Sequence, residues 1–141
     1  MKKLMAELLA RLDEEHAKWG VPPDPLNDLA ENWERAIFAK RISEHGIIGF
    51  IDDYALIYIP HDEIGKASRN AYRILSERLK KSGHTLHMVH PMNLRSVKLT
   101  RRIGAKPMGR DDNGFIHYLL RSEDFPHHSE DKTHGEEISS S

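Results

Sequence analysis

Three histidines have a spacing that invites a metal-binding interpretation. His84, His87 and His90 follow one another at intervals of three residues, and a neutral imidazole is a common ligand of zinc. The flanking residues are typical of a β-strand, in which successive side chains point to opposite faces. His84 and His90 would then share one face and His87 the other, so the three cannot converge on one ion. We therefore expect no metal site here.

The composition excludes several kinds of site and one kind of segment. The 141 residues contain no cysteine, which excludes disulfides, thiol catalysis and thiolate metal sites. The mean hydropathy is −0.63, and no apolar run approaches the roughly 20 residues that a membrane-spanning helix needs. No secretory signal is evident in residues 1–19, which are charged and amphipathic. The length predicts one domain, and a cytosolic setting is the simplest interpretation.

Charge is distributed unevenly along the chain. Residues 64–110 contain twelve Lys or Arg residues and one acid, Glu77, for a net charge of +11, whereas the whole chain has a net charge of −1. This separation favours an anionic partner, or contact with an acidic part of the same chain or of another copy. Nucleic acid is a weaker candidate, because no recognition motif is present and aromatic residues do not alternate with the basic ones.

The elements that must position these groups follow from hydrophobic periodicity and turn residues. Residues 1–19 have the helical spacing of apolar side chains, and Gly20 with the prolines after it ends that helix. A short second helix is expected from Asn27 to about Trp33. Three apolar segments joined by short turns predict an antiparallel meander: residues 35–42, 47–50 and 55–59. The last is a continuous apolar run, which is typical of a buried central strand.

The carboxyl-terminal half predicts two further helices. The first spans about residues 65–81 and leads into a strand at residues 85–89, an order that favours a parallel strand neighbour through a right-handed crossover. Asn93 is a suitable cap for the second helix. Residues 106–120 then form a hairpin across an Asn-Gly turn. Residues 126–141 are polar and without periodicity, so we expect a disordered tail.

The second of these helices resembles a pattern of the GNAT family of N-acetyltransferases. That pattern places an Asn, a small residue, a Tyr and a Gly-Phe pair along one helix. Asn93, Ser96 and Gly104 match it, whereas Thr100 stands at the usual Tyr and Ala105 at the usual Phe. In the family, that Tyr is often the acid that protonates the departing thiolate of coenzyme A. Because an aliphatic hydroxyl is a much weaker acid than a phenol, the resemblance implies the fold more strongly than the activity.

The start of the preceding helix resembles the pyrophosphate loop of the same family, whose backbone N–H groups bind cofactor phosphates. Residues 62–67, Asp-Glu-Ile-Gly-Lys-Ala, fit its Gly and Ala positions. Asp62 and Glu63 add two carboxylates, which oppose phosphate binding unless Lys66 and Arg69 compensate. The same acids also suit the first turn of any helix through its dipole. The resemblance implies that bound acetyl-CoA would contact these residues: Gly65, Lys66, Ala67, Arg69, Asn93 and Ser96.

A narrower resemblance, over about residues 20–120, is to the GNAT-like internal virion proteins of short-tailed bacteriophages. It rests on Gly-Lys-Ala at residues 65–67 and on Asn93 followed, after nine residues, by Ile-Gly-Ala at residues 103–105. The usual first strand of the fold is not evident, because residues 1–19 predict a helix. The resemblance implies a protein of virion assembly or genome delivery, located in the host cytoplasm or the virion.

The expected architecture is therefore an α/β domain with a GNAT-like mixed β-sheet flanked by helices. An N-terminal amphipathic helix occupies residues 1–20, the GNAT-like domain residues 21–125, and a disordered polar tail residues 126–141. The favoured function is that of a phage virion-associated or assembly protein on a degenerate, non-catalytic acetyltransferase fold. Its partners would be other phage proteins, a second copy, or an anionic partner on the basic surface of residues 64–110.

The alternative function is that of an active acetyl-CoA-dependent N-acyltransferase. In that case His45, His61 and Glu63 are candidate general bases, because the resemblance places them near the strands that flank a substrate cleft. The same residues in the same places are also typical of exposed turns without a catalytic role. No catalytic residue is therefore assigned from the sequence.

Overall fold

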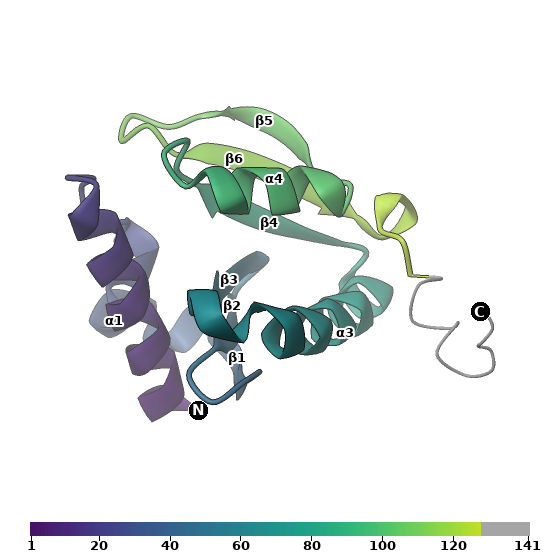
Figure 1. Cartoon of the computed structure of the whole chain (residues 1–141), viewed down its shortest axis with the longest axis horizontal. Coiled ribbons are helices and arrows are strands. Elements are labelled where there is room, and N and C mark those ends of the chain that lie inside the picture. The colour runs from purple at the N-terminus through teal and green to yellow at the C-terminus, as the bar shows by residue number, and fades with distance from the viewer. Residues whose placement is uncertain (128–141) are drawn as a thin grey trace.

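The chain folds around a mixed sheet of six strands with helices on both faces, as seen in a computed structural model that describes residues 1–127 (Figure 1). In chain order the elements are α1 (Lys2–Lys18), α2 (Leu29–Asn32), β1 (Ala36–Arg41), β2 (Ile47–Ile51), β3 (Tyr54–Tyr58), α3 (Ile64–Ser82), β4 (His84–Val89), α4 (Leu94–Arg102), β5 (Lys106–Arg110) and β6 (Ile116–Arg121). The predicted α/β class, the mixed sheet and the N-terminal helix are confirmed. The segment from His128 onward lies outside the described residues.

The strands form two antiparallel groups that meet at one place. The sheet order is β1-β2-β3-β4-β6-β5, with β1–β3 a meander and β5–β6 a hairpin beside β4. The crossover through α3 makes β3 and β4 parallel, as predicted, but only Tyr54 and Leu86 are partners across this junction. The Leu86 N–H donates to the Asp53 carbonyl at 2.8 Å. Beyond this contact β3 and β4 diverge, and the sheet is open between their carboxyl-terminal ends.

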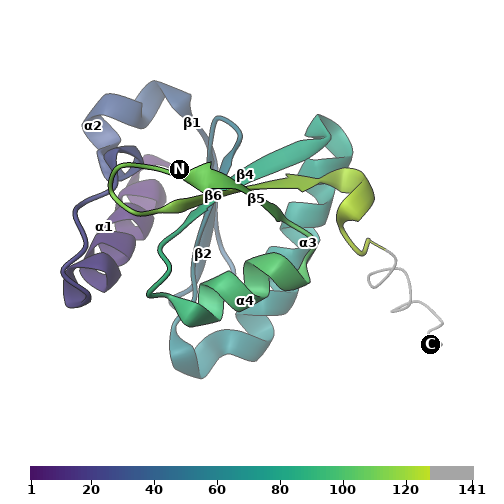
Figure 2. The same cartoon turned by 90° about the horizontal axis from the view of Figure 1, so that it is seen from above.

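Helices cover the two faces of the sheet separately, with α1 on one side and α3 on the other (Figure 2). The face under α1 holds one group of buried side chains: Met5, Leu8, Leu9, Leu26, Ala36, Ile47, Ile51 and Leu56. The face under α3 holds a second group, which includes Ala67, Ala71, Leu75 and Leu79 with Phe50, Tyr118 and Leu120. Gly49 lets α1 approach β2, because a Cβ there would lie 2.8 Å from Leu8 Cδ2.

β2, not β3, is the strand that is buried along its whole length. All five residues of Ile47–Ile51 are buried, because helices cover both faces of this strand. In β3 only Ala55 and Leu56 are buried, whereas Ile57 and Tyr58 are half-buried. The continuous apolar run at residues 55–59 therefore belongs to a strand that borders the opening, and its apolar side chains face partly empty space.

Local hydrogen bonds hold the elements around the opening. The Asn93 side chain accepts a hydrogen bond from the Ser96 N–H at 3.2 Å, so the predicted cap of α4 is confirmed. Gly83 ends α3 in the left-handed region, with φ of 86°. Pro126 and His127, assigned to the tail by sequence, contact α3: the Tyr72 hydroxyl donates to the Pro126 carbonyl at 2.6 Å. None of the helices in residues 1–127 is long and apolar enough to cross a bilayer.

Candidate functional site

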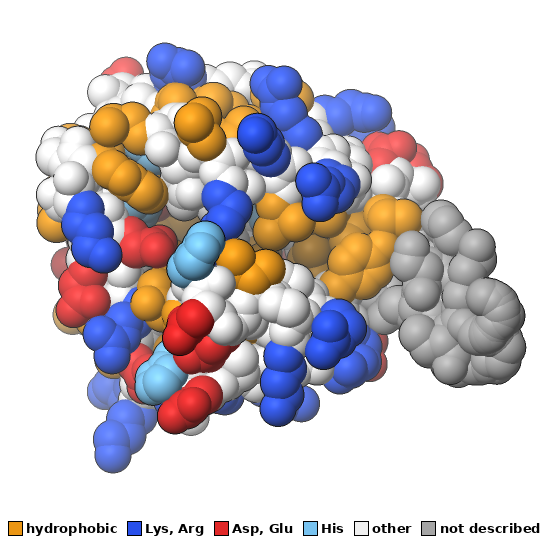
Figure 3. Space-filling view, viewed as in Figure 1, with side chains coloured by type: hydrophobic (Ala, Val, Ile, Leu, Met, Phe, Trp, Pro, Cys, Tyr) orange, Lys and Arg blue, Asp and Glu red, His pale blue; other side chains and the backbone are white. Residues whose placement is uncertain are grey.

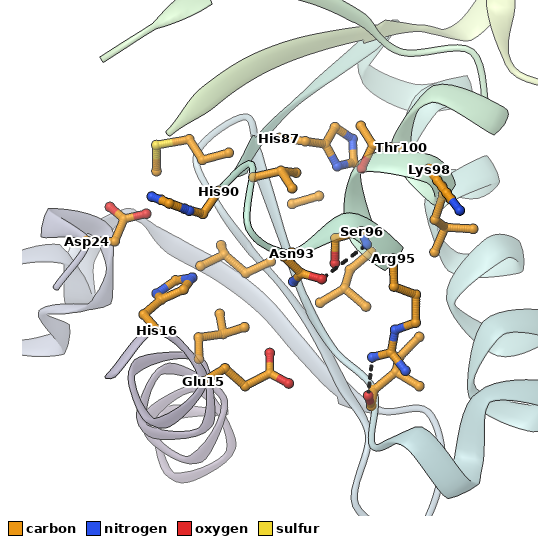
Figure 4. A pocket seen from close by; sticks show the side chains of 18 of the residues that line it. Glu15, His16, Asp24, His87, His90, Asn93, Arg95, Ser96, Lys98 and Thr100 are labelled. Atoms are coloured by element: carbon orange, nitrogen blue, oxygen red, sulfur yellow. Dashed lines mark hydrogen bonds between the residues drawn. The ribbon is translucent and has the colours of Figure 1, made fainter. Parts of the chain in front are cut away.

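A cavity of about 570 Å³ lies between the diverging ends of β3 and β4 (Figure 4). One wall is formed by the start of α3 and by α4. The other wall is formed by α1 and the loop after it, through these residues: Leu12, Glu15, His16, Asp24, Leu26 and Asn27. Because β3 and β4 pair at a single position, the cavity is bordered by elements from both faces of the sheet.

The structure brings together four of the six residues predicted to bind a cofactor. Three of them line the cavity: Gly65, Asn93 and Ser96. Arg69 lies beside this wall, with Nη1 3.8 Å from the position that a Cβ on Gly65 would occupy. The Lys66 side chain is exposed, and the Ala67 side chain is fully buried in the core under α3. The Ala67 N–H belongs to the regular hydrogen bonding of α3, which begins at Ile64, so Ala67 offers no ligand atom.

The two carboxylates before α3 are placed differently from each other. Glu63 turns away from the helix axis and accepts hydrogen bonds from Ser43 Oγ, the His45 N–H and His45 Nδ1 at 2.5, 2.8 and 2.6 Å. These bonds, with the Ser43 hydroxyl first, lower the pKa of Glu63 to about 2. Asp62 is exposed. No side chain caps the first turn of α3, which follows directly on the 3-10 turn His61–Glu63. The N–H groups of this turn therefore have no side-chain acceptor.

The predicted general bases do not lie in the cavity. His45 and Glu63 form an ion pair on the turn between β1 and β2, and this hydrogen bond raises the pKa of His45. His61 is exposed in the turn before α3. Glu44 joins His45 and Glu63 in a group whose ligand atoms lie within 4.8 Å of one another. Because Glu63 already accepts three hydrogen bonds, its oxygens serve the turn rather than a metal.

The three histidines in and directly after β4 have separate partners. His84 Nε2 lies 3.2 Å from Asp53 Oδ2 at the surface. His90 packs edge-on against Phe115, with ring centroids 5.2 Å apart. His87 is buried and bonds through Nε2 to Thr85 Oγ1 at 2.8 Å. The three rings therefore do not form a common site.

A neutral polar patch lies at the inner end of the cavity. Figure 4 shows His87 beside Thr100, and both side chains line the cavity although they are only 6% and 7% exposed. Burial lowers the pKa of His87 to about 4, so this imidazole is neutral at neutral pH. Tyr118 is the register partner of His87 on β6, and its buried hydroxyl has no hydrogen-bond partner among the described residues.

The wall formed by α1 carries titratable groups that sequence reasoning missed. Burial raises the pKa of Glu15, against the opposing effect of Arg95 across the cavity. Burial lowers the pKa of His16, which Asp13 raises and His90 lowers. Glu15 and His16 follow Leu12 by three and four residues, so they continue its apolar stripe on the inward face of the helix. This spacing from Leu12 is the sequence signal that could have identified both residues as facing inward.

The surface around the cavity is basic where α3 and α4 form it. Figure 3 shows Lys and Arg side chains on both sides of an apolar hollow between these helices. The acids of the remaining chain pair with other arginines: Glu7 with Arg41 at 2.9 Å and Asp52 with Arg35 at 2.6 Å. Lys80 aside, no Lys or Arg of the 64–110 segment forms an ion pair within residues 1–127. Ion pairs with the acidic remainder therefore do not neutralise this surface.

Comparisons with known proteins add no assignment. No family model matches the chain, and a search of curated proteins gives no match. The chemistry of the cavity therefore follows from its own residues: an uncapped helix start with Arg69, a neutral inner end, and an acidic wall on α1.

Proposed function

We propose that this protein is an acyltransferase of the GNAT type, which binds an acyl-coenzyme A between α3 and α4 and transfers the acyl group within the cavity. The observation that carries the proposal is the opening between the parallel strands β3 and β4. Diverging strands leave backbone N–H and C=O groups without sheet partners, and these groups suit the amide-rich arm of coenzyme A. From β4 onward the order strand, helix, hairpin is also the order that the family resemblance implies, whereas α1 stands where the family usually has its first strand.

The residues at the start of α3 fit the phosphates of such a donor. The first-turn N–H groups are uncapped, and Gly65 has no side chain to keep a phosphate away from them. Arg69 lies close enough to Gly65 to contact the same phosphate, while the hydrogen bonds to Ser43 and His45 draw the Glu63 carboxylate aside. One of the two carboxylates that opposed phosphate binding is therefore engaged elsewhere.

The inner end of the cavity differs from the usual proton donor of the family. Thr100 stands where the family has Tyr, and its neighbour His87 is neutral at neutral pH, so its remaining ring N–H is only a very weak acid. Neither side chain is a strong acid, so the departing thiolate takes its proton from water. The residues of this chain therefore serve mainly to bind, orient and partly dehydrate the reacting groups.

Isothermal titration calorimetry with acetyl-CoA tests the proposal. We expect a dissociation constant in the micromolar range. Arg69→Glu should weaken binding by about tenfold or more, because charge-assisted hydrogen bonds to phosphate contribute about 1.5–3 kcal/mol. Lys81→Glu is the matched control: it makes the same charge change at the far end of α3. The absence of binding at millimolar acetyl-CoA, or equal weakening by both variants, would reject the proposal.

The unneutralised basic surface favours a second candidate function, that of a phage virion-associated or assembly protein with an anionic partner. Leu94 on α4 is 67% exposed and Met108 on β5 is 59% exposed, which adds apolar area beside the basic residues. In this case DNA retention should be strongly salt-dependent. It should be lost in the double variant Arg101→Glu with Arg102→Glu, whereas acetyl-CoA should not bind. Retention that survives the double variant would reject this candidate.

A further inference from the structure

The two walls of the cavity carry charges of opposite sign. The charged residues of the α4 wall are Arg95, Lys98 and Arg102, and those of the α1 side are Glu15 and Asp24. Within residues 1–127 none of these five forms an ion pair. The cavity therefore offers a positive wall to one reactant and a negative wall to another.

Asp24 is the most buried charge of the α1 side. It is 7% exposed, and its Oδ1 accepts one hydrogen bond, from the Leu26 N–H at 2.9 Å. No Lys or Arg among the described residues pairs with it, and His117, which acts on its pKa from a distance, is paired with Asp111 at 2.9 Å. Burial raises the pKa of this carboxyl. A buried carboxylate without a cation is unfavourable, so a positively charged ligand group would relieve this cost when it binds.

His16 is the group of this wall that can accept a proton. Its Nδ1 is buried without a partner, and neither ring nitrogen makes a hydrogen bond within the described part of the chain. Its ring packs at nearly a right angle against Phe115, with centroids 5.1 Å apart, which holds the imidazole in the cavity wall. The titratable groups that face it are Asp13 from its own helix and His90 from the end of β4, and burial lowers its pKa. Because Nδ1 is buried, Nε2 is the nitrogen that a ligand in the cavity can reach, and a neutral imidazole with an unbonded nitrogen is a suitable general base.

We infer that the α1 side of the cavity is an acceptor site for a small molecule with two amino groups. Asp24 binds one ammonium group and His16 removes a proton from the other. Such a molecule is a dication at neutral pH, which matches the two carboxylates Asp24 and Glu15 (Figure 4). The reaction, unlike the binding, rests on the proposed acyl transfer.

In the acyl transfer to this molecule, the amine is the nucleophile and coenzyme A is the leaving group. The reacting ammonium group loses one proton to His16, and its nitrogen lone pair forms a C–N bond to the thioester carbon. The C–S bond breaks and sulfur keeps its electron pair, leaving as the coenzyme A thiolate, which takes a proton from water. The nitrogen then loses its second proton to solvent and becomes a neutral amide nitrogen.

Binding is tested on the full chain without acyl-coenzyme A, by calorimetry with three probes of equal chain length. These are 1,4-diaminobutane, 1-aminobutane and 4-aminobutanoate, whose far ends are cationic, neutral and anionic. We expect 1,4-diaminobutane to bind about tenfold tighter than 1-aminobutane, and 4-aminobutanoate to bind weakest, since hydrogen bonds to a charged group contribute about 1.5–3 kcal/mol. Equal affinities, or no binding of 1,4-diaminobutane, would overturn the inference.

A matched pair of variants locates the site. Asp24→Asn keeps an oxygen for the Leu26 N–H and removes the charge, so it should weaken 1,4-diaminobutane binding about tenfold. Asp112→Asn makes the same change on the exposed hairpin turn and should leave the affinity unchanged. If Asp24→Asn does not fold, Glu15→Gln is the variant to use, and it should weaken 1,4-diaminobutane binding by a smaller factor. Equal effects at Asp24 and Asp112 would reject Asp24 as the binding group.

Turnover tests His16 separately. Thiol release from acetyl-CoA in the presence of 1,4-diaminobutane should fall about 100-fold or more in His16→Gln, which is typical for a lost general base. The affinity for acetyl-CoA should be unchanged. The rise in rate with pH that accompanies deprotonation of His16 should be absent in the variant. His84→Gln, at the surface, is the control. Binding of acetyl-CoA without Asp24-dependent binding of 1,4-diaminobutane rejects this inference alone, whereas the reverse result rejects the acyl transfer and keeps the diamine site.

Discussion

Burial of His87 should make the folded protein sensitive to acid. Burial lowers its pKa from 6.5 to about 4, so the unfolded chain takes up this proton at a higher pH than the folded chain does. The stability that comes from a neutral His87 is therefore fully present above pH 6.5 and is lost as the pH falls toward 4. At about 1.4 kcal/mol per pKa unit, the total loss is about 3.5 kcal/mol, of which about 2.5 kcal/mol is lost by pH 4.5.

The perturbation that isolates this effect is His87→Gln. The Gln amide can still bond to Thr85 Oγ1, where His87 Nε2 now lies at 2.8 Å, but it cannot be protonated. Urea unfolding at about pH 7.5 and 4.5 gives the loss of unfolding free energy for each protein, and the loss should be about 2.5 kcal/mol smaller in the variant. His84→Gln, which removes an exposed histidine, should keep the wild-type loss. Equal losses in wild type and His87→Gln would refute the reasoning.

Three substitutions test the packing by urea unfolding. Tyr118→Phe should leave the free energy of unfolding unchanged or raise it by up to about 1 kcal/mol, because no partner of the buried hydroxyl is found among the described residues; a large loss would reveal one. Gly104→Ala should destabilise by about 3 kcal/mol or more, because a Cβ would collide with the Asp124 carbonyl at a φ of +101°. Gly109→Ala, with open space around it, is the control and should show little change. Leu8→Ala should cost about 2–5 kcal/mol, and a smaller loss would mean that α1 packs loosely.

The elements were predictable because local residues mark their ends. Asn93 caps α4 through its own side chain, and Gly83 ends α3 in a conformation that other residues rarely adopt. The Asn-Gly turn likewise marks the β5–β6 hairpin. These signals act within a few residues of the chain, so one sequence is sufficient to read them.

The cavity was not predictable, because it depends on contacts between distant segments. The divergence of β3 from β4 follows from pairing at Tyr54 and Leu86 alone, and nothing in either strand marks that position. Glu15 and His16 read as polar residues of an amphipathic helix until α1 is placed against the sheet. The direction of the Glu63 side chain depends on Ser43 and His45, twenty and eighteen residues earlier. Sequence reasoning therefore found the α3 and α4 wall and missed the wall opposite.

The core under α1 has a consequence for the order of folding. All its buried members lie between Met5 and Leu56, so the contacts among them need neither α3 nor the strands after it. Contacts such as that of Leu8 with Gly49 join distant residues, but the entropy cost of closing a loop rises only slowly with its length. During synthesis from the amino terminus, α1 and the meander can therefore collapse before α3 leaves the ribosome, and the β4–β6 strands would dock on a surface that is already folded. Pulse-labelling hydrogen exchange should then protect the amides of β2 before those of β6.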